Sequence, residues 1–455
     1  MAVAAGASGG AMKFPKVMDV GPAARPLRIA IAYGRIPLPM RRADQLTVAH
    51  LLSFLKARGH AVDLYCVNTG GVADEAELAW LNDACREVHL YKHGKSDIAR
   101  ALLGTLKGLP TQVGLFSHPG QRRDVRARIA KGDYDIVYTY YFRSAEITRD
   151  TGRPSGTSFV PSDTRPATFL ALQLSQSLNT KRIAQNAPNL ANRLFYAVES
   201  RLVAAYETRI WKHFTHSVLI GPRDVEEIAK TCREQGLAPI DNYVFGAHGT
   251  DVTRFAPRPD IAEKQHHLVF SGVMRTPTNV HAVQWFAQNV WPRVRAAVPN
   301  ATWTIVGREP SAEVQELGKL PGITVAGTVP DPATYMAEAA ICINSMQAGG
   351  GMQNKLIEYL AMGKAIVATP VANEGIGATS GEHLLVAEAP EDFADAVIAL
   401  LNDEARRTAL GAAGRAFVLE NWTWESHWLR LEENFYAAIG PETGAHASPS
   451  AGAPE

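Results

Sequence analysis

The sequence predicts an α/β protein built from two doubly wound domains, and three observations support this fold class. Apolar runs of strand length alternate with amphipathic runs of helix length, which is the order of parallel βαβ units. The alternation is found in two successive series, and 455 residues are enough for two domains of ordinary size. Hydrophobic residues make up 46% of the chain and so supply two substantial cores.

The first domain is expected over residues 27–256. Leu27–Tyr33 (LRIAIAY) has the composition of a buried parallel strand, a helix from Ala43 to Arg58 follows, and Ala61–Val67 is the next strand. This order is that of a βαβ unit in a doubly wound sheet. Further strands are predicted at Asp135–Tyr141, Ser158–Pro161 and Ser217–Ile220.

The second domain is expected over residues 257–421, with the boundary at Pro257–Asp260. It begins with the strand His267–Ser271 and the helix Val280–Val298. Four more strands are predicted at Thr302–Val306, Ile323–Ala326, Ile341–Ser345 and Ala365–Thr369. This second series therefore has the same alternating organisation as the first.

A last helix is predicted over residues 422–439. It carries Trp422, Trp424, Trp428 and Phe435 and is long enough to return to the first domain, although periodicity equally allows a helix that stays on its own domain. The flanking segments, residues 1–26 and 440–455, are rich in small residues and proline and are expected to be disordered.

Charge, cysteine content and hydropathy exclude several classes of protein. Lys and Arg number 46 against 45 Asp and Glu, so the whole-chain charge gives no reason to expect a nucleic-acid partner. The four cysteines lie far apart and without paired spacing, which favours buried thiols in a reducing compartment over a disulfide or metal framework. Because the sequence contains no apolar run of membrane-spanning length, we expect a cytoplasmic protein.

A glycine run, Gly349 to Gly351, lies between two predicted strands and opens a predicted helix. Glycines let the backbone approach a ligand closely, and helix N-termini favour phosphate oxygens. Lys355 and Glu358 share one face of this helix and offer an ammonium for phosphate and a carboxylate for vicinal hydroxyls. The pair suits a nucleoside diphosphate. The alternative is an exposed ion pair, which the position between two strands argues against.

Three loops follow predicted strands of the second domain, where open α/β sheets bind ligands. The first runs from Ser271 to Asn279 and contains Gly272 and Arg275. The others hold Gly307 and the pair formed by Thr328 and Val329. A solvated arginine and ordinary turn chemistry are the alternative explanations for these residues.

The order of elements around the glycine run resembles that of the GT-B glycosyltransferases, specifically family 4. Glu358 fits the second glutamate of the family's donor-site signature, and Gly350 stands at the first. The chain is similar to a subgroup with a glycine-rich entry and an Asn-Lys pair. The resemblance implies two Rossmann-like domains that face an interdomain cleft, and a C-terminal helix that crosses back to the first domain.

The resemblance also implies an activity. It is the transfer of a sugar, of the hexosyl type, from a nucleotide-diphosphate donor to a glycan or lipid-linked acceptor, with retention of configuration, in cell-surface or extracellular polysaccharide synthesis. Arg275 and Lys355 are then the catalytic candidates, because they stabilise the departing diphosphate. The implied donor-binding residues are Gly272, Gly307, Thr328, Val329, Gly350, Gly351, Gln353, Asn354 and Glu358.

The implied acceptor side is less well marked. The loop after the first strand contributes Arg41, Arg42 and Asp44, and Arg143 follows a later strand. No metal ligand set is expected, because Asp133-Tyr134-Asp135 precedes its strand and so lies at the wrong end of the sheet. We expect no cofactor, with the nucleotide sugar as a co-substrate.

Two segments of the first domain, Gln121–Lys131 and Lys181–Lys212, are rich in basic residues. They suit an anionic lipid surface or a lipid-diphosphate acceptor, which would place the protein at the inner face of a membrane; a solvated face is the alternative. Two other functions stay open: a non-catalytic nucleotide-sugar-binding subunit and a sugar-nucleotide epimerase of the same fold.

Overall fold

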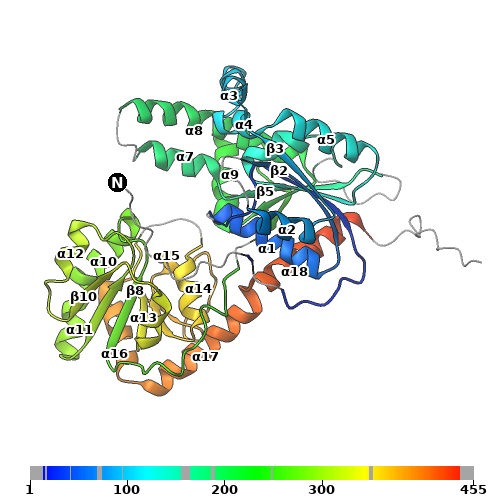
Figure 1. Cartoon of the computed structure of the whole chain (residues 1–455). Coiled ribbons are helices and arrows are strands. Elements are labelled where there is room, and N and C mark those ends of the chain that lie inside the picture. Colours follow the sequence, from blue (N-terminus) through cyan, green and yellow to red (C-terminus); the bar gives the residue numbers. More distant parts are fainter. Residues whose placement is uncertain are drawn as a thin grey trace, which may run out of the picture. The chain divides into compact units, whose positions relative to one another are not determined.

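The computed structural model describes residues 14–15, 18–40, 42–68, 74–94, 96–153, 155, 164–185, 190–246, 249–347 and 352–440. The chain divides into two compact units, each built around one sheet (Figure 1). Of the described residues, the N-terminal unit contains those from Phe14 to Leu219, from Asp224 to Gly246 and from Trp428 to Gly440, whereas the C-terminal unit contains those of Ile220–Arg223 and Ala247–His427. The division thus falls between residues 246 and 247, whereas the sequence suggests one near Pro257.

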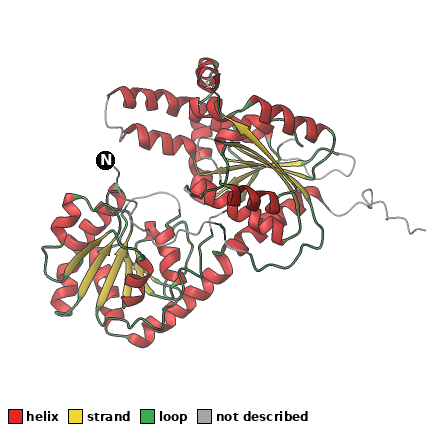
Figure 2. Ribbon diagram, in the orientation of Figure 1, coloured by secondary structure: helices red, strands yellow, loops and turns green. Residues whose placement is uncertain are grey.

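The sheet of the N-terminal unit has seven parallel strands within the described residues, in the order β3-β2-β1-β4-β5-β6-β7. They are β1 (Arg28–Tyr33), β2 (Ala61–Asn68), β3 (Glu87–Lys92), β4 (Ile136–Tyr140), β5 (Ala167–Gln173), β6 (His216–Leu219) and β7 (Tyr243–Phe245). Helices cover both faces of this sheet (Figure 2). They are α1 (Ala43–Ala57), α2 (Glu75–Ala84), α3 (Ser96–Leu106), α4 (Thr111–Phe116), α5 (Pro119–Ala130), α6 (Ala145–Thr148), α7 (Gln176–Gln185), α8 (Leu190–Ile210) and α9 (Pro222–Glu234), with 3-10 turns η1 (Phe142–Ser144) and η2 (Trp211–His213).

The sheet of the C-terminal unit has six parallel strands within the described residues, in the order β10-β9-β8-β11-β12-β13. They are β8 (His267–Ser271), β9 (Thr302–Val306), β10 (Ile323–Gly327), β11 (Ile341–Asn344), β12 (Ala365–Ala368) and β13 (Leu385–Val386). The helices are α10 (Pro277–Asn289), α11 (Trp291–Ala297), α12 (Ala312–Leu317), α13 (Pro332–Glu338), α14 (Asn354–Ala361), α15 (Pro370–Asn373), α16 (Pro390–Leu401) and α17 (Glu404–Asn421).

Both sheets reverse their strand order at one point, between β1 and β4 in the first and between β8 and β11 in the second. Such reversals are the topological switch points at which doubly wound sheets bind ligands. The predicted fold class, with two Rossmann-like domains, is confirmed.

The last helix, α18 (Trp424–Ile439), passes from the C-terminal unit to the N-terminal unit at Trp428. Phe435 packs edge-on against Phe169 of β5 and Tyr138 of β4, with ring centroids 4.8 and 5.9 Å apart. The Glu432 carboxylate accepts hydrogen bonds from Arg58 at 2.9 Å and from His60 at 2.7 Å. The predicted crossing helix is therefore confirmed, and a helix confined to its own domain is excluded.

Several predicted elements differ from the structure. The predicted helix Val280–Val298 is two helices, α10 and α11, because Pro292 removes a backbone donor just after Val290. The segment Ser158–Pro161, predicted as a strand, lies outside the described residues. Within the described ranges, no helix is both long and apolar enough to cross a membrane.

Candidate functional site

The residues predicted to bind the donor gather at the carboxyl edge of the C-terminal sheet. Gly272 directly follows β8, which flanks the switch point, and Gly307 directly follows the neighbouring strand β9. A Cβ atom at Gly307 would stand 1.5 Å from the carbonyl oxygen of Gly272. At Gly272, it would stand 2.8 Å from the Asn279 amide nitrogen. Only glycine allows these loops to lie so close together, which leaves bare backbone at this edge.

Helix α14 begins at Asn354, as the sequence predicts for the helix that follows the glycine run. Lys355, at its second position, is only 9% exposed. Its Nζ donates to Asn279 Oδ1 of α10 at 2.5 Å and lies 4.4 Å from the centroid of the Phe270 ring. One turn later, the Tyr359 hydroxyl accepts from the Ser271 backbone N–H at 2.6 Å. Helix α14 is thus fixed against the end of β8 and the start of α10.

The hydrogen-bond partners of Lys355 Nζ are neutral: the Asn279 amide and, at 3.6 Å, the Met346 sulfur. Burial lowers the pKa of Lys355 to about 7, against the opposing effect of Glu358. Burial also raises the pKa of Glu358, and the charges of Arg254 and Lys355 oppose that shift. A buried lysine whose hydrogen-bond partners are neutral is costly to charge in the free protein, and an anionic ligand would be favourable beside it.

Asn344 ends β11, the strand beside β8 at the switch point, and is completely buried. Neither polar atom of its side-chain amide has a hydrogen-bond partner among the described residues. Buried amides are nearly always paired in folded proteins, so Asn344 is a candidate for hydrogen bonding to a further group at this edge. Sequence reasoning missed Asn344 and, at the end of the first loop, the role of Asn279.

The remaining donor-site candidates lie further out. Arg275 is exposed, and its Nε donates to Glu309 at 2.8 Å, so it forms a surface ion pair apart from Lys355. Thr328 is exposed, whereas Val329 packs against the hydrophobic core. Gln353 is the residue before the first turn of α14, and Asn354 is exposed there. Gly350 and Gly351 lie outside the described residues.

A second cluster occupies the switch point of the N-terminal sheet. Asp44, in the first turn of α1, accepts from Arg35 at 2.5 Å and from Arg143 at 3.0 Å. Both guanidinium groups lie over the Phe116 ring, at 5.0 and 4.6 Å from its centroid. All three charged side chains are at most 15% exposed. Burial, reinforced by Arg35, lowers the pKa of Arg143.

This cluster contains two of the predicted acceptor-side residues and one that was missed. The structure joins Asp44 and Arg143 and adds Arg35, whose only sequence signal is its place in an arginine-rich loop after β1. Arg42 is exposed before the start of α1, and Arg41 lies outside the described residues. Tyr141, whose ring lies 4.9 Å from the Arg143 guanidinium, has a positive φ of 97°, a conformation that non-glycine residues rarely adopt.

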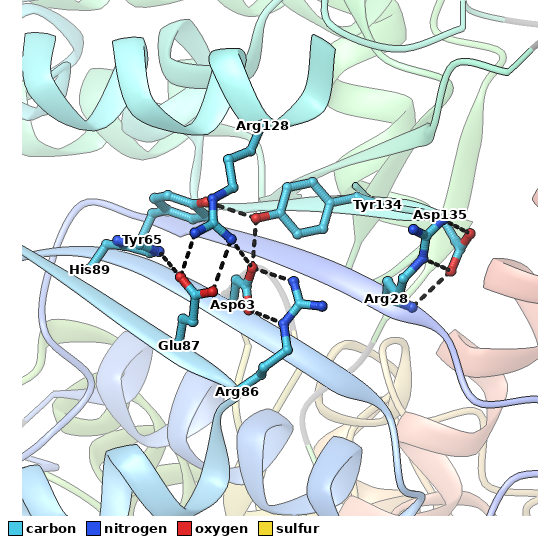
Figure 3. A network of polar contacts seen from close by, with 9 residues as sticks. All are labelled: Arg28, Asp63, Tyr65, Arg86, Glu87, His89, Arg128, Tyr134 and Asp135. Carbon is cyan, nitrogen blue, oxygen red and sulfur yellow. Dashed lines mark hydrogen bonds and ion pairs between the residues drawn. The ribbon is translucent and has the colours of Figure 1, made fainter. Parts of the chain in front are cut away.

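Figure 3 shows a third polar network, at the opposite, amino edge of the N-terminal sheet. Asp63 accepts from Arg86 at 2.6 Å and from the Tyr134 hydroxyl at 2.7 Å, and Asp135 accepts from Arg28. Tyr134 and Asp135 of the Asp133-Tyr134-Asp135 segment therefore serve the fold, at the edge that lacks the candidate sites. Among the described residues, no group of three or more His, Cys, Asp and Glu side chains is placed to hold a metal ion.

The same network corrects the interpretation of Gln121–Lys131 as a basic face. Arg128 of α5 donates to Glu87 at 2.7 Å and to Asp63 at 3.3 Å (Figure 3). Arg126 donates to the carbonyl oxygens of Ile147 and Arg149. Because two arginines of this helix bind inward, it cannot present all of its predicted charge to a surface.

Residues 265–403 match the family model of group 1 glycosyl transferases. An uncharacterised 44.6 kDa protein in the cps region of Klebsiella pneumoniae is 21% identical over 409 residues, which cover 87% of this chain and 96% of that protein. A GDP-mannose-dependent monoacylated alpha-(1-6)-phosphatidylinositol monomannoside mannosyltransferase of Corynebacterium glutamicum is 30% identical over 225 residues, or 41% of this chain and 56% of the enzyme.

Solved structures share the fold across most of the chain. The Anabaena protein HepE, solved in complex with UDP-glucose, aligns with a TM-score of 0.53 and 13% identity over 90% of this chain and 99% of its own. The likeness extends over both units, whereas the family match is confined to the C-terminal unit. The chain thus shares its two-domain fold with HepE, and residues 265–403 of its C-terminal unit are similar to group 1 glycosyl transferases.

Proposed function

We propose that the protein transfers a hexosyl group from a nucleotide-diphosphate donor to a glycan or lipid-linked acceptor, with retention of configuration. The observation that carries the proposal is the buried Lys355 at the switch point of the group 1 domain, beside the bare backbone of Gly272 and Gly307. The names of the mannosyltransferase and of the HepE complex support a nucleotide-sugar donor. The cps-region relative supports a role in polysaccharide synthesis.

The donor would bind with its diphosphate toward Lys355 and the N-terminus of α14. When the bond between the sugar and the diphosphate breaks, negative charge grows on the leaving phosphate oxygen. An ammonium held in a low-dielectric site stabilises that charge more strongly than one in water does. Arg275 is exposed, so it is free to exchange its Glu309 partner for a phosphate.

The acceptor hydroxyl would attack on the face that the diphosphate leaves. Its proton passes to the leaving phosphate oxygen, so the atoms balance without a protein nucleophile. Glu358 would accept hydrogen bonds from the ribose hydroxyls, and the loop with Thr328 and Val329 would flank the base. Arg143, Asp44 and Arg35 would bind the acceptor.

The decisive experiment measures release of nucleoside diphosphate. A thermal-shift panel of UDP and GDP sugars first finds the donor, because a ligand at one hundred times its Kd adds about 2.7 kcal/mol to the free energy of unfolding. We expect diphosphate release that depends on an acceptor and is lost in Lys355→Ala. Binding without release would support a non-catalytic subunit. Conversion of the sugar nucleotide without acceptor would support an epimerase.

A further inference from the structure

Two helices of the N-terminal unit expose large apolar side chains to solvent. On α3, Ile98, Leu102, Leu103 and Leu106 are between 58% and 85% exposed. On α8, Leu194, Phe195 and Val198 are between 49% and 68% exposed. Seven of the twelve exposed large hydrophobic residues in the described chain therefore lie on two helices. Such clustering is unusual for a surface that contacts only water.

The two helices adjoin through α4. Glu199 of α8 accepts from the backbone N–H of Thr111, the first residue of α4, at 2.9 Å. Helix α4 in turn packs closely on α3, because a Cβ at Gly114 would stand 2.9 Å from the Ala101 Cα. Helix α7 lies alongside α8 (Figure 1). We call the solvent-facing side of these four helices the α3–α8 surface.

The charge on the α3–α8 surface is of one sign. The described acidic side chains of the four helices are Asp97, Glu199 and Glu207, and all are buried, at 3%, 5% and 0% exposure. The exposed charged residues on and directly after these helices are all basic: Lys107, Lys181, Arg193, Arg201 and Arg209. A hollow of about 240 Å³ next to Gly108 is lined by Arg209 and by Arg149 and His213, and the last two contact the carboxylate of Asp150.

The buried acids are used to hold the helices together. Glu199 caps the start of α4, and Glu207 accepts from the backbone N–H groups of Gln176 and Ser177 at the start of α7, at 2.5 and 3.2 Å. Asp97 pairs with Arg100. The three acidic side chains of these helices are thus buried in internal contacts, and the exposed side chains that remain are apolar or basic.

We propose that the α3–α8 surface docks on an anionic phospholipid bilayer. Its leucine and phenylalanine side chains would enter the interface while its lysines and arginines contact lipid phosphates. A second copy of the chain fits less well, because the exposed charged side chains of the four helices are basic and two such faces would bring like charges together. The docking itself is argued from the surface alone. Its purpose, which is to bring the enzyme to a lipid-linked acceptor, rests on the proposed function.

Sedimentation with vesicles tests the proposal on the full-length protein. We expect binding to vesicles of mixed phosphatidylcholine and phosphatidylglycerol, weaker binding to phosphatidylcholine alone, and release as salt rises from about 0.05 to about 0.5 M. Leu103→Ser with Leu106→Ser should raise the Kd for anionic vesicles at least about tenfold. Arg193→Gln with Arg201→Gln should also weaken binding and reduce its dependence on salt.

The control is Leu320→Ser with Leu419→Ser, which removes two exposed apolar side chains, at 42% and 44% exposure, from the C-terminal unit and should leave vesicle binding unchanged. Lys355→Ala should bind vesicles like the wild type, so loss of activity and loss of docking are measured separately. Equal binding of the α3 variant and the wild type would overturn the proposal. So would a lipid-free dimer that the same variant converts to a monomer, which would make the surface a self-association face.

Discussion

At the scale of single residues, Lys355 is the most informative side chain because its burial opposes stability. The Lys355 ammonium packs against an aromatic ring, an amide and a sulfur, so charging it carries a desolvation cost. An apolar side chain at this position would avoid that cost. A ligand with negative charge would offset this cost. The two polar atoms of the Asn344 side chain, at the end of β11, likewise have no hydrogen-bond partner among the described residues.

Lys355 and Glu358 should have separable kinetic effects. We expect Lys355→Ala to lower kcat as well as donor affinity, because the charge that it meets grows as the bond breaks. Glu358→Gln should mainly raise the donor KM, because the ribose hydroxyls do not change during cleavage. The loss of binding free energy should be roughly 1.5 to 3 kcal/mol. The control is Lys319→Ala, which breaks an exposed pair with Glu316. Wild-type kinetics in both site variants would place the site elsewhere.

The lowered pKa of Lys355 predicts how stability depends on pH. The folded-state pKa is about 7 and the ordinary value is 10.5, so between these values the unfolded chain binds more protons and unfolding becomes harder as pH rises. Relative to Lys355→Met, ligand-free wild type should gain about 2 kcal/mol in free energy of unfolding from pH 7 to pH 9. Urea melts of both proteins measure this difference, and parallel pH curves would contradict it.

At the scale of elements, the sequence predicts strands best where β-branched runs are bounded by turn residues. Strands β8, β9 and β11 are of this kind. Strand β5 (ATFLALQ) was missed because its Ala and Leu residues are also good helix formers, although all seven residues are buried. Strands β3 and β13 were not predicted either. Strand β3 (EVHLYK) is polar and half-buried at the sheet edge, and β13 has only two residues, so neither forms a clear apolar run.

The residues of the candidate site also fall into two groups: those that the sequence indicates and those that only the structure reveals. Gly272, Gly307, Lys355 and Glu358 stand in local patterns with a physical meaning, so the sequence indicates them. Asn279, Asn344 and Arg35 become notable only through partners, or missing partners, that tertiary structure brings within reach. Such contacts join residues that are far apart in the sequence, so no local pattern predicts them.

Helix α18 gives a prediction at this scale. Phe435 is 1% exposed and packs on two rings of the N-terminal sheet. Phe435→Ala should therefore lower the free energy of unfolding by about 3 to 5 kcal/mol. Phe195→Ala is the control, because Phe195 is 49% exposed in the same unit and should change stability by less than about 0.5 kcal/mol. Equal effects in chemical denaturation would mean that the C-terminal part of α18 does not anchor on this sheet.

At the scale of the whole molecule, the two units repeat one design with different chemistry. Each sheet reverses its strand order once, and each reversal holds buried positive charge: Lys355 in the C-terminal unit, and Arg35 with Arg143 in the N-terminal unit. The second cluster has one carboxylate for two guanidinium groups. We therefore expect both substrates to carry groups that accept hydrogen bonds from cations.

This distribution of charge predicts that catalysis does not depend on a divalent metal. We propose that Lys355, Arg275 and the N-terminus of α14 bind the diphosphate and supply the positive charge that a metal ion supplies in metal-dependent transferases. Activity in excess EDTA should therefore stay within about twofold of the untreated rate. Lys355→Ala, assayed with and without magnesium, tests whether a metal can replace the ammonium. Complete loss of wild-type activity on chelation, restored by magnesium or manganese, would refute the assignment of the diphosphate to these side chains.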